Sequence, residues 1–145
     1  MNELKKRIER PELFSAIKNS IGDARCSVKR LAEMFTLNIQ PLRLEVSESV
    51  FDDLTHNIQD LEGFMEFIRE LNEGMRYFEG FGLPLDPVSS EDSGLNLFKE
   101  MHSALEAKDW IMLSDLIEYE LSPLLLREDE WLGALHEKIC KYEGD

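Results

Sequence analysis

The chain has 145 residues with 30 acidic and 16 basic side chains, so its formal net charge at pH 7 is -14. Hydrophobic residues make up 43% of the chain, which excludes a disordered acidic tail and suits one folded domain over residues 1–145. The acidity argues against nucleic-acid binding, because phosphate contacts need clustered lysine and arginine, and equally against adhesion to anionic membranes.

The charge is unevenly distributed along the chain. Residues 1–43 carry nine basic and five acidic side chains, which gives +4, whereas residues 44–145 carry seven basic and 25 acidic side chains, which gives -18. One interpretation is that a basic helix packs beside acidic helices and reduces repulsion within the fold. The alternative is that the acidic surface receives a basic partner.

The sequence shows no targeting signal. The basic residues near the N-terminus are not followed by the apolar run of a signal peptide, and no segment approaches the ~20 apolar residues that span a bilayer. We therefore expect a cytoplasmic protein with no membrane partner. Cys26 and Cys140 form no Cys-x-x-Cys motif and are expected to be free thiols.

The first predicted helix covers residues 12–39. Pro11 fits its first turn, where the missing N–H is not needed. Thr36 to Val46 is expected to form an extended connection, because apolar and charged residues alternate at its end. The apolar residues of the helix recur at spacings of three and four and form one stripe: Phe14, Ile17, Ile21, Ala24, Val28, Leu31 and Phe35.

The second predicted helix covers residues 48–79, with Ser47 or Ser49 as its N-cap. Its stripe is wide enough to contact more than one neighbouring helix. Asn72 lies on this stripe, either as a polar residue at the edge of the surface or as a buried residue that sets register. The apolar residues of the stripe are Phe51, Leu54, Ile58, Leu61, Met65, Ile68 and Met75.

The remaining elements are shorter. Residues 80–90 form a glycine- and proline-rich loop that is expected to be mobile or used for binding. Helices are predicted over 91–106, 110–121 and 123–143, with a tight turn at Lys108 and Asp109, and Ser122–Pro123 is expected to break or kink the last rod. The predicted fold is an all-α, antiparallel up-down bundle of four main helices.

No constellation of catalytic, cofactor-binding or metal-ligating residues is found in the sequence. Glu-x-x-His motifs of bundle metal sites are missing, and Asp53-x-x-His56 is the nearest approach. The acidic runs 118–120 and 128–130 are expected to be solvated surface. An alternative for Glu118, Tyr119 and Glu120 is that they line a groove beside Pro123.

Five residues are candidates for an interface. Trp110 and Trp131 each lie near a helix start or bend, and tryptophan is enriched in binding hot spots, although core packing is the competing interpretation. Asn72 and Phe78 belong to the wide stripe of the second helix, and Phe81 lies in the loop that follows.

These features favour a non-enzymatic helical module for protein–protein interaction or assembly, similar in kind to an adaptor or a chaperone and expected to form a homodimer. The alternative is a small bundle enzyme or ligand-binding protein with an internal carboxylate or metal site. Binding of nucleic acid through the basic first helix is a third hypothesis, which the net charge disfavours.

Overall fold

In the computed structural model of the protein, residues 2–75 and 93–143 are described, and every regular element within them is helical. The predicted all-α class is therefore confirmed for these residues. The predicted loop 80–90, Phe78 and Phe81 lie outside them. The elements are α1 (Asn2–Leu44), α2 (Glu48–Met75), α4 (Ser93–Ala107), α5 (Trp110–Leu116), the π-helical turn η2 (Ile117–Leu121) and α6 (Ser122–Glu143).

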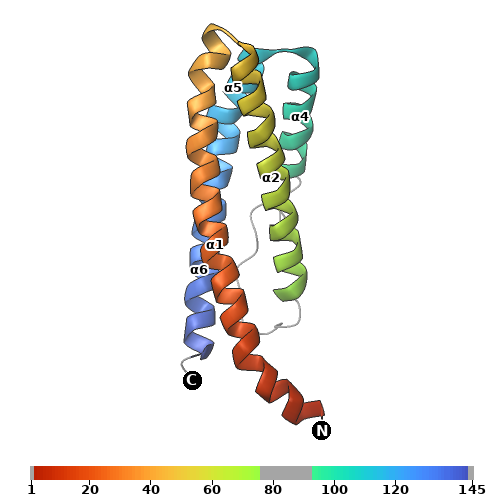
Figure 1. Ribbon diagram of the computed structural model, residues 1–145, viewed down its shortest axis with the longest axis vertical. Coiled ribbons are helices and arrows are strands. Elements are labelled where there is room, and N and C mark those ends of the chain that lie inside the picture. The colour runs from red at the N-terminus through yellow and green to blue at the C-terminus, as the bar shows by residue number, and fades with distance from the viewer. Residues whose placement is uncertain (1, 76–92, 144–145) are drawn as a thin grey trace.

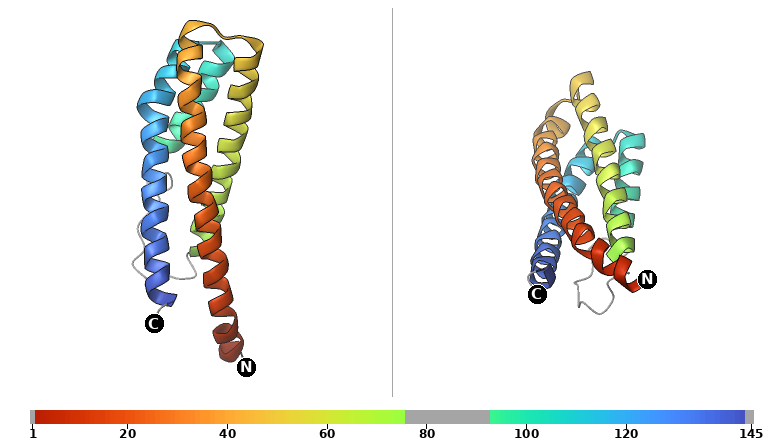
Figure 2. Two further views of the ribbon diagram at one scale, coloured as in Figure 1. Left: turned by 60° about the vertical axis from the view of Figure 1, so that its left-hand side comes forward. Right: turned by 60° about the horizontal axis from the view of Figure 1, so that its bottom comes forward.

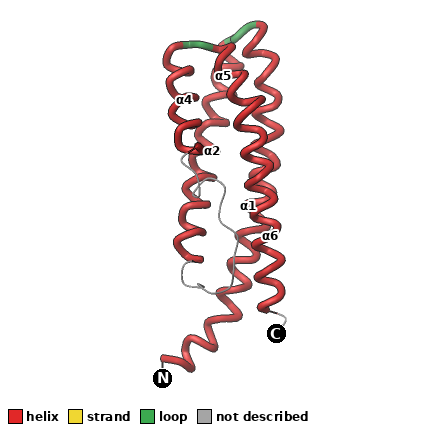
Figure 3. Tube along the Cα trace, turned by 180° about the vertical axis from the view of Figure 1, so that it is seen from behind, coloured by secondary structure: helices red, strands yellow, loops and turns green. Residues whose placement is uncertain are grey.

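The helices run along one long axis (Figure 1). α1 rises to the end of the molecule at which α2 begins, α2 returns, α4 rises again, and α5, η2 and α6 descend as one rod. α1 and α6 lie side by side, while α2 and α4 form the other side of the molecule (Figure 2). Both short connections, α1 to α2 and α4 to α5, lie at the same end (Figure 3).

α1 is the helix on which the core is built, because it contacts α2, α5 and α6. Its buried residues extend the predicted stripe by about two turns, from Phe35 to Leu42. The facing helices bury their own stripes against it, including Leu54, Ile58 and Ile68 of α2. On α4 the buried positions are Leu97, Met101 and Ala104. The part of the chain that the structure describes contains no helix with the length and apolar character that a bilayer crossing requires.

α1 is longer than its sequence predicts, at both ends. The expected extended connection after residue 36 is wrong, since residues 36–44 are helical and contain Pro41. Proline removes one backbone donor and normally ends a helix. Here Leu42 is 2% exposed and anchors the last turn in the core, and the carbonyl of Pro41 accepts the N–H of Glu45 at 2.9 Å. Tertiary burial thus outweighs the local preference against helix.

Pro11 also lies inside α1 and not in its first turn, because the helix begins at Asn2. The first turns of α1, red in Figure 1, angle away from the axis of the rest of the helix. A proline that cannot donate to the preceding turn is a common cause of such a bend.

The predicted restart at Ser122 is wrong, because the helix passes through this residue without interruption. Ser122 has helical dihedrals (φ -59°, ψ -46°), and its N–H donates to the carbonyl of Ile117, five residues earlier. In an α-helix the ring of Pro123 would clash with the carbonyl four residues before it. The wider π turn immediately before Pro123 accommodates the ring, and such insertions are frequent at functional sites.

The predicted helix starts at residues 48 and 110 agree with the structure, whereas the predicted start at residue 91 lies outside the described residues. The N–H of Val50 donates to Ser47 Oγ at 3.3 Å, which makes Ser47 the cap of α2. The predicted turn at Lys108 is confirmed: Lys108 adopts a positive φ of 56°, and Asp109 caps α5 by accepting the N–H of Met112 at 3.1 Å.

A buried amide pair joins α1 to α2. Asn57 Nδ2 donates to Asn38 Oδ1 at 2.8 Å, and the two residues are 7% and 6% exposed. A hydrogen bond between side chains in a low-dielectric interior favours the one alignment in which both partners meet. The pair therefore fixes how far α2 slides along α1.

The substitution Asn57→Ala removes the donor and leaves the buried Asn38 carbonyl without it. We expect a loss of about 1–3 kcal/mol in the free energy of unfolding, measured by urea denaturation. The double variant Asn38→Leu with Asn57→Leu replaces both polar groups and should be close to neutral by comparison. If the loss in unfolding free energy of the double variant equals the sum of the losses in Asn38→Leu and Asn57→Leu, the two side chains do not interact and the coupling is contradicted.

Three helical glycines differ in what surrounds them. A Cβ added at Gly22 or Gly63 meets nothing within 4 Å, so alanine there should stabilise each helix by about 0.5–1 kcal/mol. At Gly133 the Cβ would lie 3.1 Å from the guanidinium of Arg25, whose Nε donates to Asp129 at 2.9 Å. We expect Gly133→Ala to stabilise the protein less than the other two alanine variants, as measured by thermal denaturation. An equal gain in stability at all three sites would contradict this packing.

Candidate functional site

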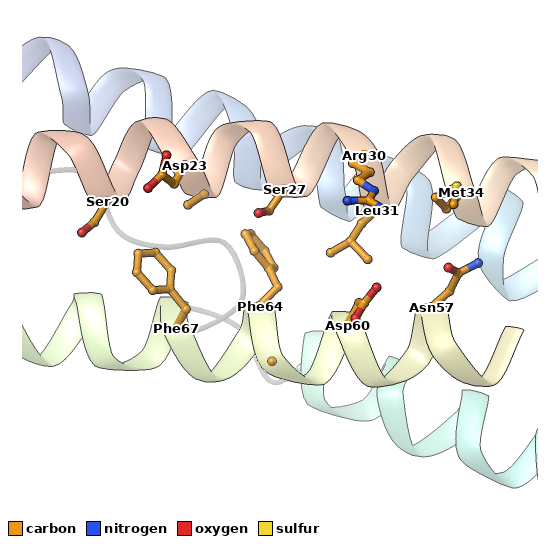
Figure 4. Close-up of a pocket in the computed structure, with 12 residues that line it drawn as sticks. Ser20, Asp23, Ser27, Arg30, Leu31, Met34, Asn57, Asp60, Phe64 and Phe67 are labelled. Atoms are coloured by element: carbon orange, nitrogen blue, oxygen red, sulfur yellow. The ribbon is translucent and has the colours of Figure 1, made fainter. Parts of the chain in front are cut away.

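A groove of about 490 Å³ lies between α1 and α2 (Figure 4). Its α1 wall runs from Ser20 to Met34 and its α2 wall from Asn57 to Phe67. The 14 helical steps from Ser20 to Met34 span about 21 Å at 1.5 Å per residue, or about four turns of helix. The groove is therefore long enough to hold a helical segment.

Small side chains create the groove. Ser20, Ala24 and Ser27 follow one another at spacings of four and three on α1, and Gly63 faces the hollow from α2. Residues of this size let another backbone approach closely, because little side-chain volume stands between the helices. The spacing places the three α1 residues on one face of the helix.

The inner part of the groove is apolar, whereas its rim is charged. Phe64 is 6% exposed and Phe67 is half-buried, and both point across the hollow toward α1 in Figure 4. Asp23 and Arg30 on α1 and Asp60 on α2 are exposed along the rim. Apolar lining with a few charged groups at the edge is typical of a binding surface for an amphipathic helix.

An exposed apolar stripe on α1 continues from the upper end of the groove. Met34 belongs to both features and is 38% exposed. Leu37 is 69% and Leu44 is 81% exposed, and Pro41 between them is half-buried. We call these four residues the outer stripe. Their spacing of three, four and three is that of a helix–helix contact seam, on the side of α1 that is not used for the core.

A second, shallower hollow lies on the outer surface of α5 and η2. Ile111, Met112 and Tyr119 are exposed there, at 54%, 43% and 68%. Asp109 and Glu120 also line it, so this apolar patch has an acidic edge. Tyr119 and Glu120 line this hollow, whereas Glu118 and Pro123 do not, so the alternative of a groove beside Pro123 is met only in part.

Glu118 has a different role, in a polar cluster that ties the end of α1 to α5 and η2. Arg43 Nη2 lies 2.8 Å from Asp115 Oδ1 and 2.6 Å from Glu118 Oε2, and Arg43 Nε donates to Ser114 Oγ at 3.2 Å. Hydrogen bonds to Asp115 and Glu118 raise the pKa of Arg43, so its guanidinium stays charged. This cluster holds the outer stripe in a fixed orientation.

The structure separates the interface candidates from one another. Trp110 is half-buried and makes an edge-to-face contact with Phe51, with centroids 6.2 Å apart. Trp131 is 6% exposed and belongs to the core, so it offers little surface to a partner. Asn72 is half-buried on α2. None of the three lines the groove. Phe78 and Phe81 lie outside the described residues.

The sequence does not predict the groove as a site: its apolar residues Ala24 and Leu31 belong to the predicted core stripe, and its polar residues lie beside that stripe. Serine and glycine at helical spacing look like ordinary solvated positions. One signal was available: Met34, Leu37 and Leu44 are large apolar residues outside the core stripe of α1. The buried pair Asn38–Asn57 was also missed, although Asn38 continues the core spacing after Phe35.

The expectation that the acidic run 128–130 is solvated is wrong for its first residue. Glu128 is fully buried, Asp129 pairs with Arg25 and is half-buried, and Glu130 is exposed. The register of α6 determines this, because Glu128 lies in the turn between the buried residues Leu124 and Leu132. Across residues whose side chains are described, no group of three or more histidine, cysteine or acidic residues is placed to hold a metal ion.

Comparison with known proteins assigns the chain to a family but does not assign a function. No curated protein and no solved structure matches it significantly. A family described as a domain of unknown function (DUF8042) matches residues 33–128, from the outer stripe of α1 through α2, α4 and α5 to the first third of α6. Because this match covers about two thirds of the 145 residues, the chain belongs to that family of domains of unknown function.

Proposed function

We propose that this chain is an antiparallel up-down helical bundle that works as a non-enzymatic assembly module and binds an amphipathic helix between α1 and α2. The observation that carries the proposal is the groove itself, with Phe64 and Phe67 along its inner side and small residues along its α1 wall. A helix that inserts large apolar side chains there would cover aromatic surface that is otherwise partly open to water.

Two further observations support an interaction module. The outer stripe adds Leu37 and Leu44, at 69% and 81% exposure, to the apolar surface beside the groove. Exposed apolar surface that is contiguous and has a charged rim commonly marks a binding site. The two exposed cysteines, Cys26 and Cys140, are free thiols, which is consistent with the cytoplasmic location that we propose.

The internal-carboxylate alternative has less support. Glu128 is a fully buried acidic side chain, but a metal site needs several converging ligands. A single carboxylate on α6 does not define a reaction or a ligand. The interaction proposal is therefore preferred.

A glycine substitution tests the proposal without disturbing the fold. Gly63 lines the groove, and a Cβ there meets nothing within 4 Å, so Gly63→Gln adds a polar side chain that projects into open space. Gly22→Gln is the matched control, because Gly22 is equally open and does not line the groove. Both variants should be at least as stable as the unmodified chain, since glycine is a poor helix former.

Tagged protein, unmodified or carrying either substitution, is used to recover bound proteins from the native host, and mass spectrometry identifies them. We expect the unmodified chain and Gly22→Gln to recover the same helical partner, or untagged copies of the chain itself, and Gly63→Gln to lose it by about tenfold or more. Identical recovery by all three forms would contradict binding at the groove.

A further inference from the structure

The outer stripe and the α1 wall of the groove form one continuous seam. Read along α1, the positions advance by alternating steps of three and four without a break, which keeps them on one side of the helix with the drift of a left-handed coiled coil. The lower half of the seam consists of Ser20, Asp23, Ser27 and Arg30, and the upper half consists of Met34, Leu37, Pro41 and Leu44.

The two halves have opposite shapes. In the lower half the small side chains of Ser20 and Ser27 leave a recess that faces the aromatic residues of α2 across the groove, while Asp23 and Arg30 lie on its rim (Figure 4). The upper half protrudes, since Leu37 and Leu44 are 69% and 81% exposed. Each half covers ten helical steps, from 20 to 30 and from 34 to 44, or about 15 Å. A recess and a ridge of equal length on one helix are complementary when two copies meet antiparallel.

We propose that the helix in the groove is α1 of a second copy of this chain, antiparallel to the first, in a closed two-fold dimer. The inference rests on the proposed function, because it names the occupant of the same groove. In a two-fold interface each contact occurs twice, so the ridge of each copy fills the recess of the other. Such an interface is closed, because neither copy keeps an unoccupied ridge or recess that could bind a third copy.

The spacing fixes the register of the pair. When Met34 of one copy lies opposite Arg30 of the other, Leu37 lies opposite Ser27 and Leu44 lies opposite Ser20. In Figure 4, Phe64 lies across the groove from Ser27, and Phe67 lies near Ser20. The two exposed leucines of the second copy therefore meet the two aromatic residues of the first.

Charge favours the same arrangement. Arg30 of the second copy lies opposite Met34 in this register. In Figure 4, Asn57 lies across the groove from Met34, and Asp60 follows one turn further along α2, within reach of a long arginine side chain. The symmetry makes this attraction between opposite charges occur twice. Residues 1–43 sum to +4 and the rest of the chain to -18, so α1 of the second copy brings a basic segment beside the acidic helix α2.

Sedimentation equilibrium of the purified full-length chain tests the dimer. We expect a dimer for the unmodified chain and for Ile111→Ser, a control that changes an apolar residue 54% exposed on α5. Leu37→Ser combined with Leu44→Ser should weaken dimerisation by roughly 100-fold or more, since both leucines would be lost from each copy. Gly63→Gln should weaken it and Gly22→Gln should not. A monomeric unmodified chain, or a dimer insensitive to the leucine changes, would overturn the inference.

A disulfide tests the register. Cys26 and Cys140 are first replaced by serine, and Asp23→Cys is combined with Pro41→Cys, which leaves both leucines in place. The two new thiols are 18 positions apart on one helix, about 27 Å, so a bond between them has to join two molecules. We expect oxidation to give a covalent dimer, and no such product from Lys29→Cys with Gln40→Cys, which lie on the other exposed side of α1. Equal cross-linking in both pairs would overturn the register.

The two proposals fail differently. If the purified chain is monomeric but Gly63→Gln still abolishes recovery of a host protein, the second-copy inference falls and the groove remains a binding site. If Gly63→Gln changes neither recovery nor sedimentation, the groove is not the binding surface and both proposals fall.

Discussion

The burial of one apolar stripe on α1 is the constraint on which the rest of the structure depends. Three other helices pack against α1, and residues from Ile21 to Leu42 on this stripe are almost fully buried. Because a helix presents its stripe on one side only, α2 and the α5–α6 rod have to share that side. The rest of the α1 surface is left free, and the outer stripe lies there, next to the core side.

Polar contacts then select one arrangement among those that would bury the same apolar area. The pair Asn38–Asn57 sets α2 along α1, Arg25 meets Asp129 on α6, and Arg43 holds the last turn of α1 against α5 and η2. Hydrophobic burial has little directional preference, whereas each of these bonds needs its partners within about 3 Å. They position the walls of the groove, although most of the stabilisation comes from the apolar core.

The groove follows from how α1 and α2 meet. Their contact is made by large residues on the core side, and the small residues Ser20, Ser27 and Gly63 lie on the outer side, so the two helices leave a hollow between them there. The same helix supplies the protruding leucines a few turns further on. One helix therefore carries both a recess and a ridge, which is the physical basis for proposing that two copies of the chain complete each other.

The sequence by itself determined the helical class, the positions of most helices, the core stripes and the turn at Lys108 and Asp109, because these depend on periodicity and on contacts within a few residues. It narrowed the cap of α2 to Ser47 or Ser49. It also showed that the charge of the first 43 residues differs in sign from the rest. Only the tertiary structure decided that α1 continues through Pro41, that a π turn replaces the break before Pro123, that Glu128 is buried and that a groove lies beside the core. Those features depend on which helix lies opposite which, and the free energy of that packing is large enough to override local preferences that the sequence alone displays.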